Sequence, residues 1–134
     1  MKFQIIFFTL AAVLLGGCAD LGFAPLPESA SHIELVGLSS PKINVHPPEL
    51  RFKASKFELS GAVAKAFGAD TTEHTRLTVS FCDQTGRLLQ SAEVDFSPRR
   101  LESYRRSIYH RGHYKLSLDA LPPGTKRIEV RAHE

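Results

Sequence analysis

Alternation of apolar and polar residues constrains the fold of this chain more than any other feature. Residues 56–63 (KFELSGAV) and 76–81 (RLTVSF) each place an apolar or small residue at every second position. A period of two residues is typical of a strand that buries one face and exposes the other. Residues 83–86 (DQTG) then have the composition of a tight turn, and residues 88–96 supply a return strand. Together these segments predict a β-hairpin.

The end of the chain predicts two further strands with a tight turn between them. Residues 113–118 and 128–132 alternate again, and the PPG sequence at 122–124 is a turn in which proline presets φ and glycine accepts a positive φ. Residues 33–38 are a weaker strand candidate, whereas the prolines within 39–55 predict an extended, irregular path. Several short strands with turns between them, and no strong amphipathic helix, predict an all-β fold: a small antiparallel β-sandwich.

The first residues predict export rather than a folded element. A positive amino end with Lys2 precedes an apolar run from Ile5 to Leu15, and two glycines and Cys18 follow. The run is shorter than the roughly 20 residues that a transmembrane helix needs. The charge, the apolar run and the small-residue exit are typical of a secretory signal peptide, here residues 1–17.

The residues Leu15-Gly16-Gly17-Cys18 resemble the lipobox of bacterial lipoproteins. The resemblance implies that the thiol of Cys18 receives a diacylglycerol, that the peptide before it is removed, and that the new amino end is acylated. Two or more acyl chains hold a protein stably on a membrane. Ala19 stands where the enterobacterial pattern for inner-membrane retention has aspartate. The resemblance therefore implies an outer-membrane lipoprotein that faces the periplasm, with the inner membrane as the alternative.

Composition divides the rest of the chain into two parts. Residues 18–32 begin with the lipidated cysteine and mix Pro, Ser, Ala and Gly without a period, which predicts a flexible tether. Residues 33–134 form the predicted β-sandwich domain, which is long enough to bury a core without disulfides. With Cys18 lipidated, Cys82 is the one remaining cysteine, and its position at the end of a predicted strand favours a buried thiol.

The segment 112–130 (GHYKLSLDALPPGTKRIEV) resembles the closing hairpin of prealbumin-like and carboxypeptidase-regulatory-like sandwiches. Residues 61–63 and 79–86 are similar to earlier strands of these domains, or of Ig-like domains in other bacterial lipoproteins. The resemblance covers residues 56–132 and implies a fold only, because its motifs describe turn geometry and not chemistry.

A basic and aromatic segment, residues 97–114 (SPRRLESYRRSIYHRGHY), is the strongest candidate for a contact surface. It contains five arginines against one acid, Glu102. Arginine matches carboxylates and phosphates, and tyrosine gives rigid contact area. The residues predicted to bind a partner are Arg99, Arg100, Tyr104, Arg105, Arg106, Tyr109 and Arg111. In the periplasm the partner would be an envelope protein or an anionic envelope component, and not nucleic acid. The alternative is a solvated connection without a ligand.

His110 and His113 are the candidate metal ligands, with Cys82 and His74 as conceivable further ones. Imidazole together with thiolate suits copper or zinc. The spacing alone does not make a site, because three or four ligands must converge and Gly112 interrupts any helix that would align the two histidines. Apart from the covalent lipid, no other cofactor is predicted.

Catalytic motifs are absent from the sequence: it has no GxSxG, no HExxH and no phosphate-binding glycine loop. The sequence therefore predicts a membrane-anchored, non-catalytic binding or envelope-assembly module that contacts its partner through residues 97–114. The alternatives are a periplasmic copper- or zinc-binding lipoprotein that uses His110 and His113, and a purely structural envelope lipoprotein.

Overall fold

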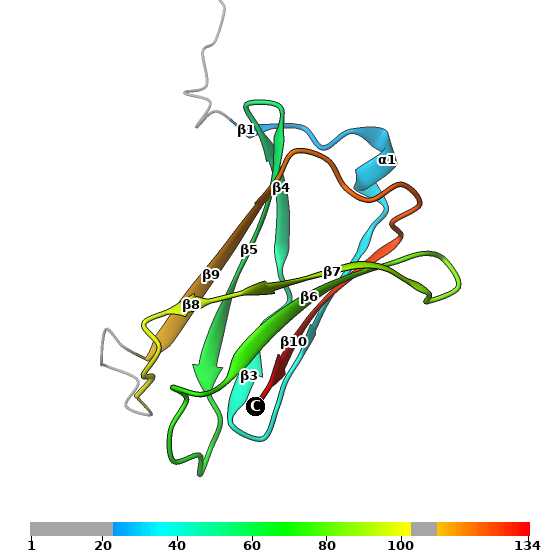
Figure 1. The fold of residues 1–134 in the computed structure, drawn as a ribbon. Coiled ribbons are helices and arrows are strands. Elements are labelled where there is room, and N and C mark those ends of the chain that lie inside the picture. Colours follow the sequence, from blue (N-terminus) through cyan, green and yellow to red (C-terminus); the bar gives the residue numbers. More distant parts are fainter. Residues whose placement is uncertain (1–22, 103–109) are drawn as a thin grey trace, which may run out of the picture.

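The computed structural model describes residues 23–102 and 110–134 and places them in two β-sheets packed face to face (Figure 1). In this part of the chain the first sheet has six strands: β1 (Phe23–Ala24), β3 (Ile43–Val45), β4 (Glu49–Lys53), β5 (Lys56–Lys65), β8 (Phe96–Ser97) and β9 (Arg111–Leu118). The second sheet has four: β2 (Glu34–Leu38), β6 (Arg76–Cys82), β7 (Leu88–Val94) and β10 (Arg127–His133). The predicted all-β sandwich is confirmed. The closing hairpin that the resemblance implied for residues 112–130 is wrong, because β9 lies in the first sheet and β10 in the second, so the turn at residues 122–124 connects the two sheets.

One strand pair departs from the predicted antiparallel arrangement. β2 pairs with β10 in parallel, with Glu34 opposite Arg127 and Leu38 opposite Arg131. A parallel pair cannot be joined by a tight turn and needs a long connection. Here the connection consists of all the strands from β3 to β9, so β2 is free to align in this direction.

The core lies between the sheets and is built mainly from the alternating residues of β5, β6, β9 and β10, to which β3, β4 and β8 add Ile43, Val45, Leu50 and Phe96. The side chains facing inward from β5, β6 and β10 are shielded completely from solvent; they are Leu59, Val63, Leu77, Val79, Phe81, Ile128 and Val130. On β9, Tyr114 is buried, while its neighbours His113 and Lys115 are exposed. The period of two in the sequence therefore separates the buried face of each sheet from the outer face.

The predicted hairpin at residues 76–96 is confirmed in its turn and corrected at its end. Asp83 accepts hydrogen bonds from the backbone N–H groups of Thr85 and Arg87, both at 2.9 Å, and from the Thr85 hydroxyl at 2.7 Å. These hydrogen bonds lower the pKa of Asp83 below its ordinary value, and the bond from the Thr85 hydroxyl has the largest effect. The return strand β7 ends at Val94, and Phe96 belongs to β8 in the other sheet. The chain crosses between the sheets at this point, and the side chain of Phe96 still reaches the core.

The segment 39–55, predicted to be irregular, contains two short strands. β3 pairs with residues 63–65 of β5, and β4 pairs with residues 56–60, so both lie on the same edge of β5. Pro47 and Pro48 stand between them, where proline cannot donate to the ladder. The prolines therefore break this edge of the sheet into two pieces, and they do not keep the segment out of the sheet.

The folded part of the chain begins before residue 33, where the tether was predicted to end. Phe23 of β1 pairs with Lys53 of β4. The short helix α1 (Glu28–Ser31) starts where the Pro27 carbonyl accepts the N–H of Ala30 at 2.8 Å, and Ala30 is 3% exposed within the core. The small residues of this segment predicted a flexible tether, but in the structure Ala30 is small enough to pack in the core beneath the helix turn. Residues 1–17, Cys18 and the first part of the predicted tether lie outside the described residues.

No helix in the described part of the chain is long and apolar enough to span a membrane.

Candidate functional site

The long strands β5 and β9 extend from one end of the sandwich to the other and separate the two ends in space. At one end Lys56 of β5 pairs with Lys53 of β4, which pairs with Phe23 of β1. At the other end Ala64 of β5 pairs with Arg111, the first residue of β9. The eight residue steps from Lys56 to Ala64 span roughly 27 Å, at about 3.4 Å per residue. The chain therefore enters the described domain far from the start of β9 (Figure 1).

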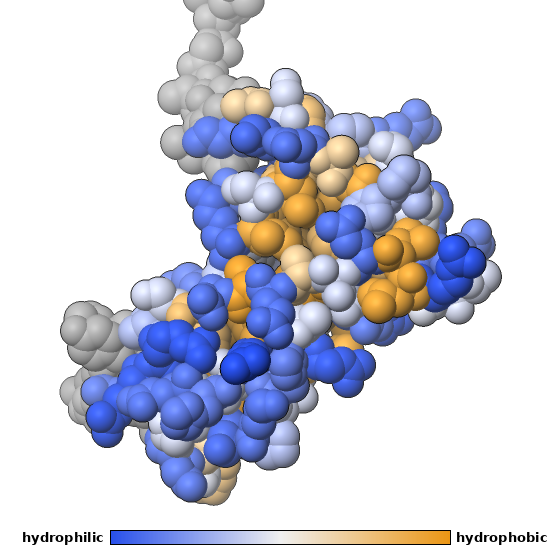
Figure 2. Space-filling view, in the orientation of Figure 1, coloured by the Kyte–Doolittle hydropathy of each residue, from blue (hydrophilic) through white to orange (hydrophobic). Residues whose placement is uncertain are grey.

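We call the end formed by residues 66–75, 98–102 and 110–111 the distal end. Figure 2 shows mainly hydrophilic residues over it, whereas apolar residues gather nearer β1 and at the turn between β6 and β7, where Leu88 is 56% exposed. Phe67 is the exception, since it is fully exposed in the loop after β5. The distal end is thus polar, with one large apolar side chain in contact with solvent.

The described beginning of the basic segment is fastened to the loop before β6. The buried Thr72 hydroxyl donates to the Arg99 carbonyl at 2.7 Å and accepts the N–H of Leu101 at 2.9 Å. Leu101 itself is 2% exposed and belongs to the core. Residues 98–102 are therefore held in a defined position, which a plain solvated connection would not require.

Arg99, predicted to bind a partner, is engaged within the chain. Its guanidinium donates to the Glu73 carbonyl at 2.6 Å, lies 4.7 Å from the centre of the Phe96 ring and is 3.7 Å from the Asp95 carboxylate. A cation over an aromatic face with a backbone acceptor is a stabilising arrangement inside a fold. Arg99 thus has a role in holding residues 95–99 against residue 73.

The other predicted contact residues divide into two groups. Arg100 is largely exposed and makes a long ion pair of 3.9 Å with Glu73, and Arg111 is exposed and has no ion pair with any described residue. Tyr104, Arg105, Arg106 and Tyr109 lie outside the described residues. The cationic side chains of Arg100 and Arg111 are therefore available to a partner at the distal end.

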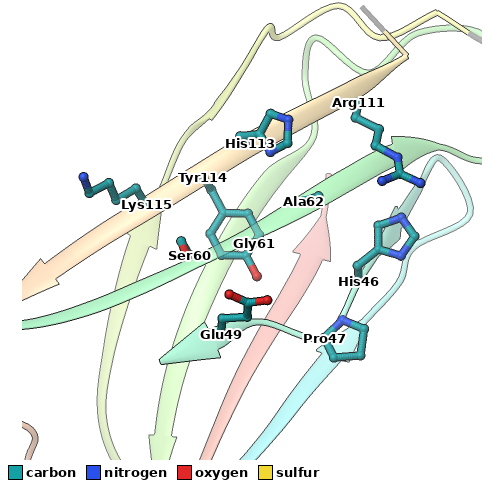
Figure 3. Close-up of a pocket in the computed structure, with 10 residues that line it drawn as sticks. All are labelled: His46, Pro47, Glu49, Ser60, Gly61, Ala62, Arg111, His113, Tyr114 and Lys115. Atoms are coloured by element: carbon teal, nitrogen blue, oxygen red, sulfur yellow. The ribbon is translucent and has the colours of Figure 1, made fainter. Parts of the chain in front are cut away.

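A groove of about 530 Å³ runs along the outer face of the first sheet beside the distal end (Figure 3). Its floor is β5, where Ser60, Gly61 and Ala62 have small side chains or none. One wall is the connection between β3 and β4 and the start of β4, and the other wall is β9. The wall residues are His46, Pro47, Glu49, Arg111, His113, Tyr114 and Lys115.

The groove exists because the edge of the sheet is broken. His46 donates its backbone N–H to the carbonyl of Ala62 at 3.1 Å, and this is the last bond before the two prolines. Beyond it the chain leaves β5 and returns only at Glu49. Sequence reasoning missed this site, apart from Arg111 and His113, because the wall around His46 forms only once β3 and β4 pair with the same edge.

Beneath the groove, the ring of Tyr114 occupies the space over Gly61, its partner in the β5–β9 pair. A Cβ atom at residue 61 would stand 2.6 Å from Cζ of that ring. A glycine inside a strand often marks a bulge or the close approach of another group, and here the approaching group is this ring. Tyr114 is 2% exposed, and its hydroxyl has no hydrogen-bond partner among the described residues. Desolvation raises the pKa of Tyr114 above its ordinary value of 10.0.

The walls of the groove carry one cation in excess. Lys115 is paired with Glu58 at 3.2 Å, and Glu49 is paired with Arg51 at 2.8 Å. Arg111 alone lacks an opposite charge among the described residues of this face. Exposed ion pairs are weak, but they fix the charge balance that an incoming ligand meets. The charged residues that line the groove, Arg111, Lys115 and Glu49, therefore carry a small excess of positive charge.

Replacing Tyr114 by phenylalanine is expected to stabilise the fold by about 1 kcal/mol, because a buried hydroxyl without a partner is costly. The gain should grow above pH 10. The pKa of Tyr114 is higher in the folded protein than in the unfolded one, so the protonated tyrosine favours the folded state. This contribution to the stability of the wild type is fully present below the pKa of an unfolded tyrosine and is lost as the pH rises towards the folded pKa. Urea unfolding of both proteins at pH 7 and pH 10.5 checks this, and a less stable variant at pH 7 would contradict it.

The candidate metal ligands do not converge. His113 faces the groove, and Nδ1 of His110 lies 3.4 Å from the Glu102 carbonyl. Cys82 lies in the other sheet as a free, buried cysteine whose thiol pKa is raised, chiefly by burial. His74 is exposed in a loop. The described residues include no group of three or more His, Cys, Asp or Glu that could hold a metal ion. Copper or zinc binding stays a prediction from the sequence.

In comparisons with known proteins, no protein-family model, curated protein or solved structure matches the chain.

Proposed function

We propose that the chain is a membrane-anchored lipoprotein of the bacterial envelope, held by a lipid on Cys18, that works as a non-catalytic binding module facing the periplasm. Its contact surface is the distal end, where Arg100 and Arg111 lie, together with the other arginines of the basic segment 97–114. The partner is an envelope protein with an acidic surface, or another anionic component of the envelope.

One observation carries this proposal. The strand nearest to the predicted anchor, β1, lies at the opposite end of β5 from Arg111. A lipid attached before residue 23 would put the β1 end nearest to the membrane, and the distal end would then face away from it. Loops on a rigid sheet scaffold are where binding residues are most often found. The fixed position of residues 98–102 gives such a surface a defined shape.

Charge reversal at the distal end tests the proposal in whole cells. The variant carries Arg100→Glu, Arg105→Glu and Arg106→Glu, and Arg99 is left intact because it holds the loop together. A matched control carries Lys53→Glu, Lys56→Glu and Lys126→Glu, which makes the same change in charge away from the distal end. We expect the distal variant to lose about tenfold or more of its crosslinked partner, because like charges at a contact are strongly unfavourable.

The control should keep its partner, and circular dichroism should show that both variants are folded. Equal crosslinking by the wild type and the distal variant would show that the contact lies elsewhere. An equal loss in both variants would mean that net charge, and not this end of the sandwich, governs the interaction.

A further inference from the structure

We infer that the protein forms a two-fold symmetric dimer, in which β7 of one copy pairs antiparallel with β7 of a second copy. The four-stranded second sheets of the two copies then join into one continuous sheet. The inference goes beyond the proposed function and does not depend on it, because it uses neither the lipid anchor nor the contact surface at the distal end. It rests on three features of β7: its open edge, its few charges and the opposite charges at its two ends.

The outer edge of β7 has no strand beside it in the described part of the chain. β7 is the last strand of the second sheet, after β2, β10 and β6 (Figure 1). Every second residue along a regular edge directs its backbone N–H and C=O groups away from the sheet, where another strand can pair with them. The strands at the other described sheet ends, β1, β8 and β2, have two, two and five residues, whereas β7 has seven. β7 therefore provides the longest of these edges.

β7 also lacks the features that usually prevent pairing between edge strands. Its residues (LLQSAEV) include no proline and no lysine, and Glu93 is the one charged residue among them. Edge strands that stay unpaired are commonly protected by such residues. A shift in register opposite Phe81 and Cys82 disturbs only the beginning of the strand, so residues 90–94 pair regularly with β6. The apolar side chain of Leu88 is 56% exposed at this edge.

The charges at the two ends of β7 have opposite signs and match those of a second copy. Arg87 precedes the strand, whereas Glu93 and Asp95 lie at its other end, and all three are exposed. Antiparallel pairing centred on Ser91 places Arg87 of each copy opposite Asp95 of the other, and opposite charges at facing positions stabilise a strand pair. The Asp95 carboxylate is 93% exposed and makes only a long ion pair of 3.7 Å with Arg99. Charge therefore favours a second copy of this chain as the occupant of the edge.

The same register keeps the inner faces of the two sheets on one side. Gln90 and Ala92 pair with Phe81 and Val79, whose side chains lie in the core, so both face inward. Centring on Ser91 places Gln90 of one copy opposite Ala92 of the other, and facing residues of a strand pair point to the same side of the sheet. Both copies use the same surface, so the contact closes at two chains.

Sedimentation equilibrium of the purified full chain in density-matched detergent measures the association. We expect a reversible monomer–dimer equilibrium with a dissociation constant of roughly 1–100 µM, because a single strand pair is a small contact. Ser91→Lys should weaken the dimer about tenfold or more, since it sets two like charges face to face at the two-fold axis. Ser117→Lys adds the same charge to an exposed position of β9 and is the matched control, which should associate like the wild type.

A charge swap tests the register. Arg87→Glu and Asp95→Lys should each weaken the dimer about fivefold, because each substitution places like charges opposite one another at both ends of the contact. The chain that carries both substitutions has complementary ends again and should associate within about twofold of the wild type. Within one chain the two residues lie at opposite ends of β7, so only a contact between copies explains this rescue. Circular dichroism checks that each variant is folded.

Disulfide crosslinking locates the two-fold axis. In a Cys82→Ala background, Ser91→Cys places two thiols at the axis, where the Cα atoms of facing residues lie about 4.5–5.5 Å apart and a disulfide can form. Mild oxidation should link most of this variant into a dimer through residue 91. Ser117→Cys in the same background is the matched control and should stay largely unlinked.

The inference is overturned if the chain stays monomeric up to about 500 µM, if Ser91→Lys associates like the wild type, or if Ser91→Cys does not form the linked dimer. Assemblies larger than a dimer would contradict a closed two-fold contact. A double charge swap that stays as weak as the single ones would overturn the register. None of these substitutions changes Cys18 or an arginine of the basic segment, so the dimer and the proposed function can fail independently.

Discussion

Replacing Cys18 by serine is expected to move nearly all of the chain that has lost residues 1–17 from the membrane fraction of the cell to the soluble fraction. A hydroxyl cannot take part in the thioether chemistry that the lipobox resemblance implies, so the variant would carry no diacylglycerol. Each buried methylene of an acyl chain contributes about 0.8 kcal/mol to membrane attachment, and two chains make attachment stable. Their loss is therefore the largest change that a single substitution in this chain should cause.

Fractionation of cells followed by immunoblotting measures this shift, and the chain offers its own matched control. Cys82→Ala removes the other cysteine, which is buried in the second sheet and has no access to a lipid-transferring enzyme. That variant should stay with the membrane. A Cys18→Ser protein that has lost residues 1–17 and still stays with the membrane would remove the lipid anchor from the proposed function. The groove would be unaffected by that result, because its residues all lie in the described domain.

The regular strands were predictable because their signal is local. In residues 56–63, 76–81, 113–118 and 128–132 the alternation itself specifies which side chains are buried, and the core follows it. The strands that the sequence missed, β3 and β4, are three and five residues long and border two prolines. They are strands because β5 offers them an edge to pair with, and this is tertiary information that a short window does not contain.

The candidate site was predictable only in part, for the same reason. An arginine-rich segment shows in the sequence, but Arg99 and Arg100 look alike there. They differ because Arg99 meets the Phe96 ring and the Glu73 carbonyl, whereas Arg100 points into solvent. The groove needs residues from the connection between β3 and β4, from β4, from β5 and from β9 at once. Of its features the sequence supplied one hint, a glycine inside a strand, without the identity of the group that approaches it.

Replacing that glycine, Gly61, by alanine is expected to destabilise the fold by about 3 kcal/mol, because the space for the new methyl group is already filled. A Cβ atom there would stand 2.6 Å from Cζ and 2.9 Å from Cε1 of Tyr114, closer than real Cβ atoms approach other atoms. The ring is buried in the core and cannot swing into solvent without exposing its apolar face, so either the ring or the strand must shift. Urea unfolding followed by circular dichroism gives the difference in free energy of unfolding.

The matched control is Ala62→Val, which enlarges the next residue on the open, outer face and should change stability by no more than about 0.5 kcal/mol. A double-mutant cycle then identifies the cause. If the Tyr114 ring is the obstacle, Gly61→Ala should cost little in a Tyr114→Leu background, which gives a coupling of roughly 2 kcal/mol between the two sites. Additive effects would show instead that Gly61 is needed for its backbone freedom. In the first case the glycine is what allows the Tyr114 ring to pack in the core against β5.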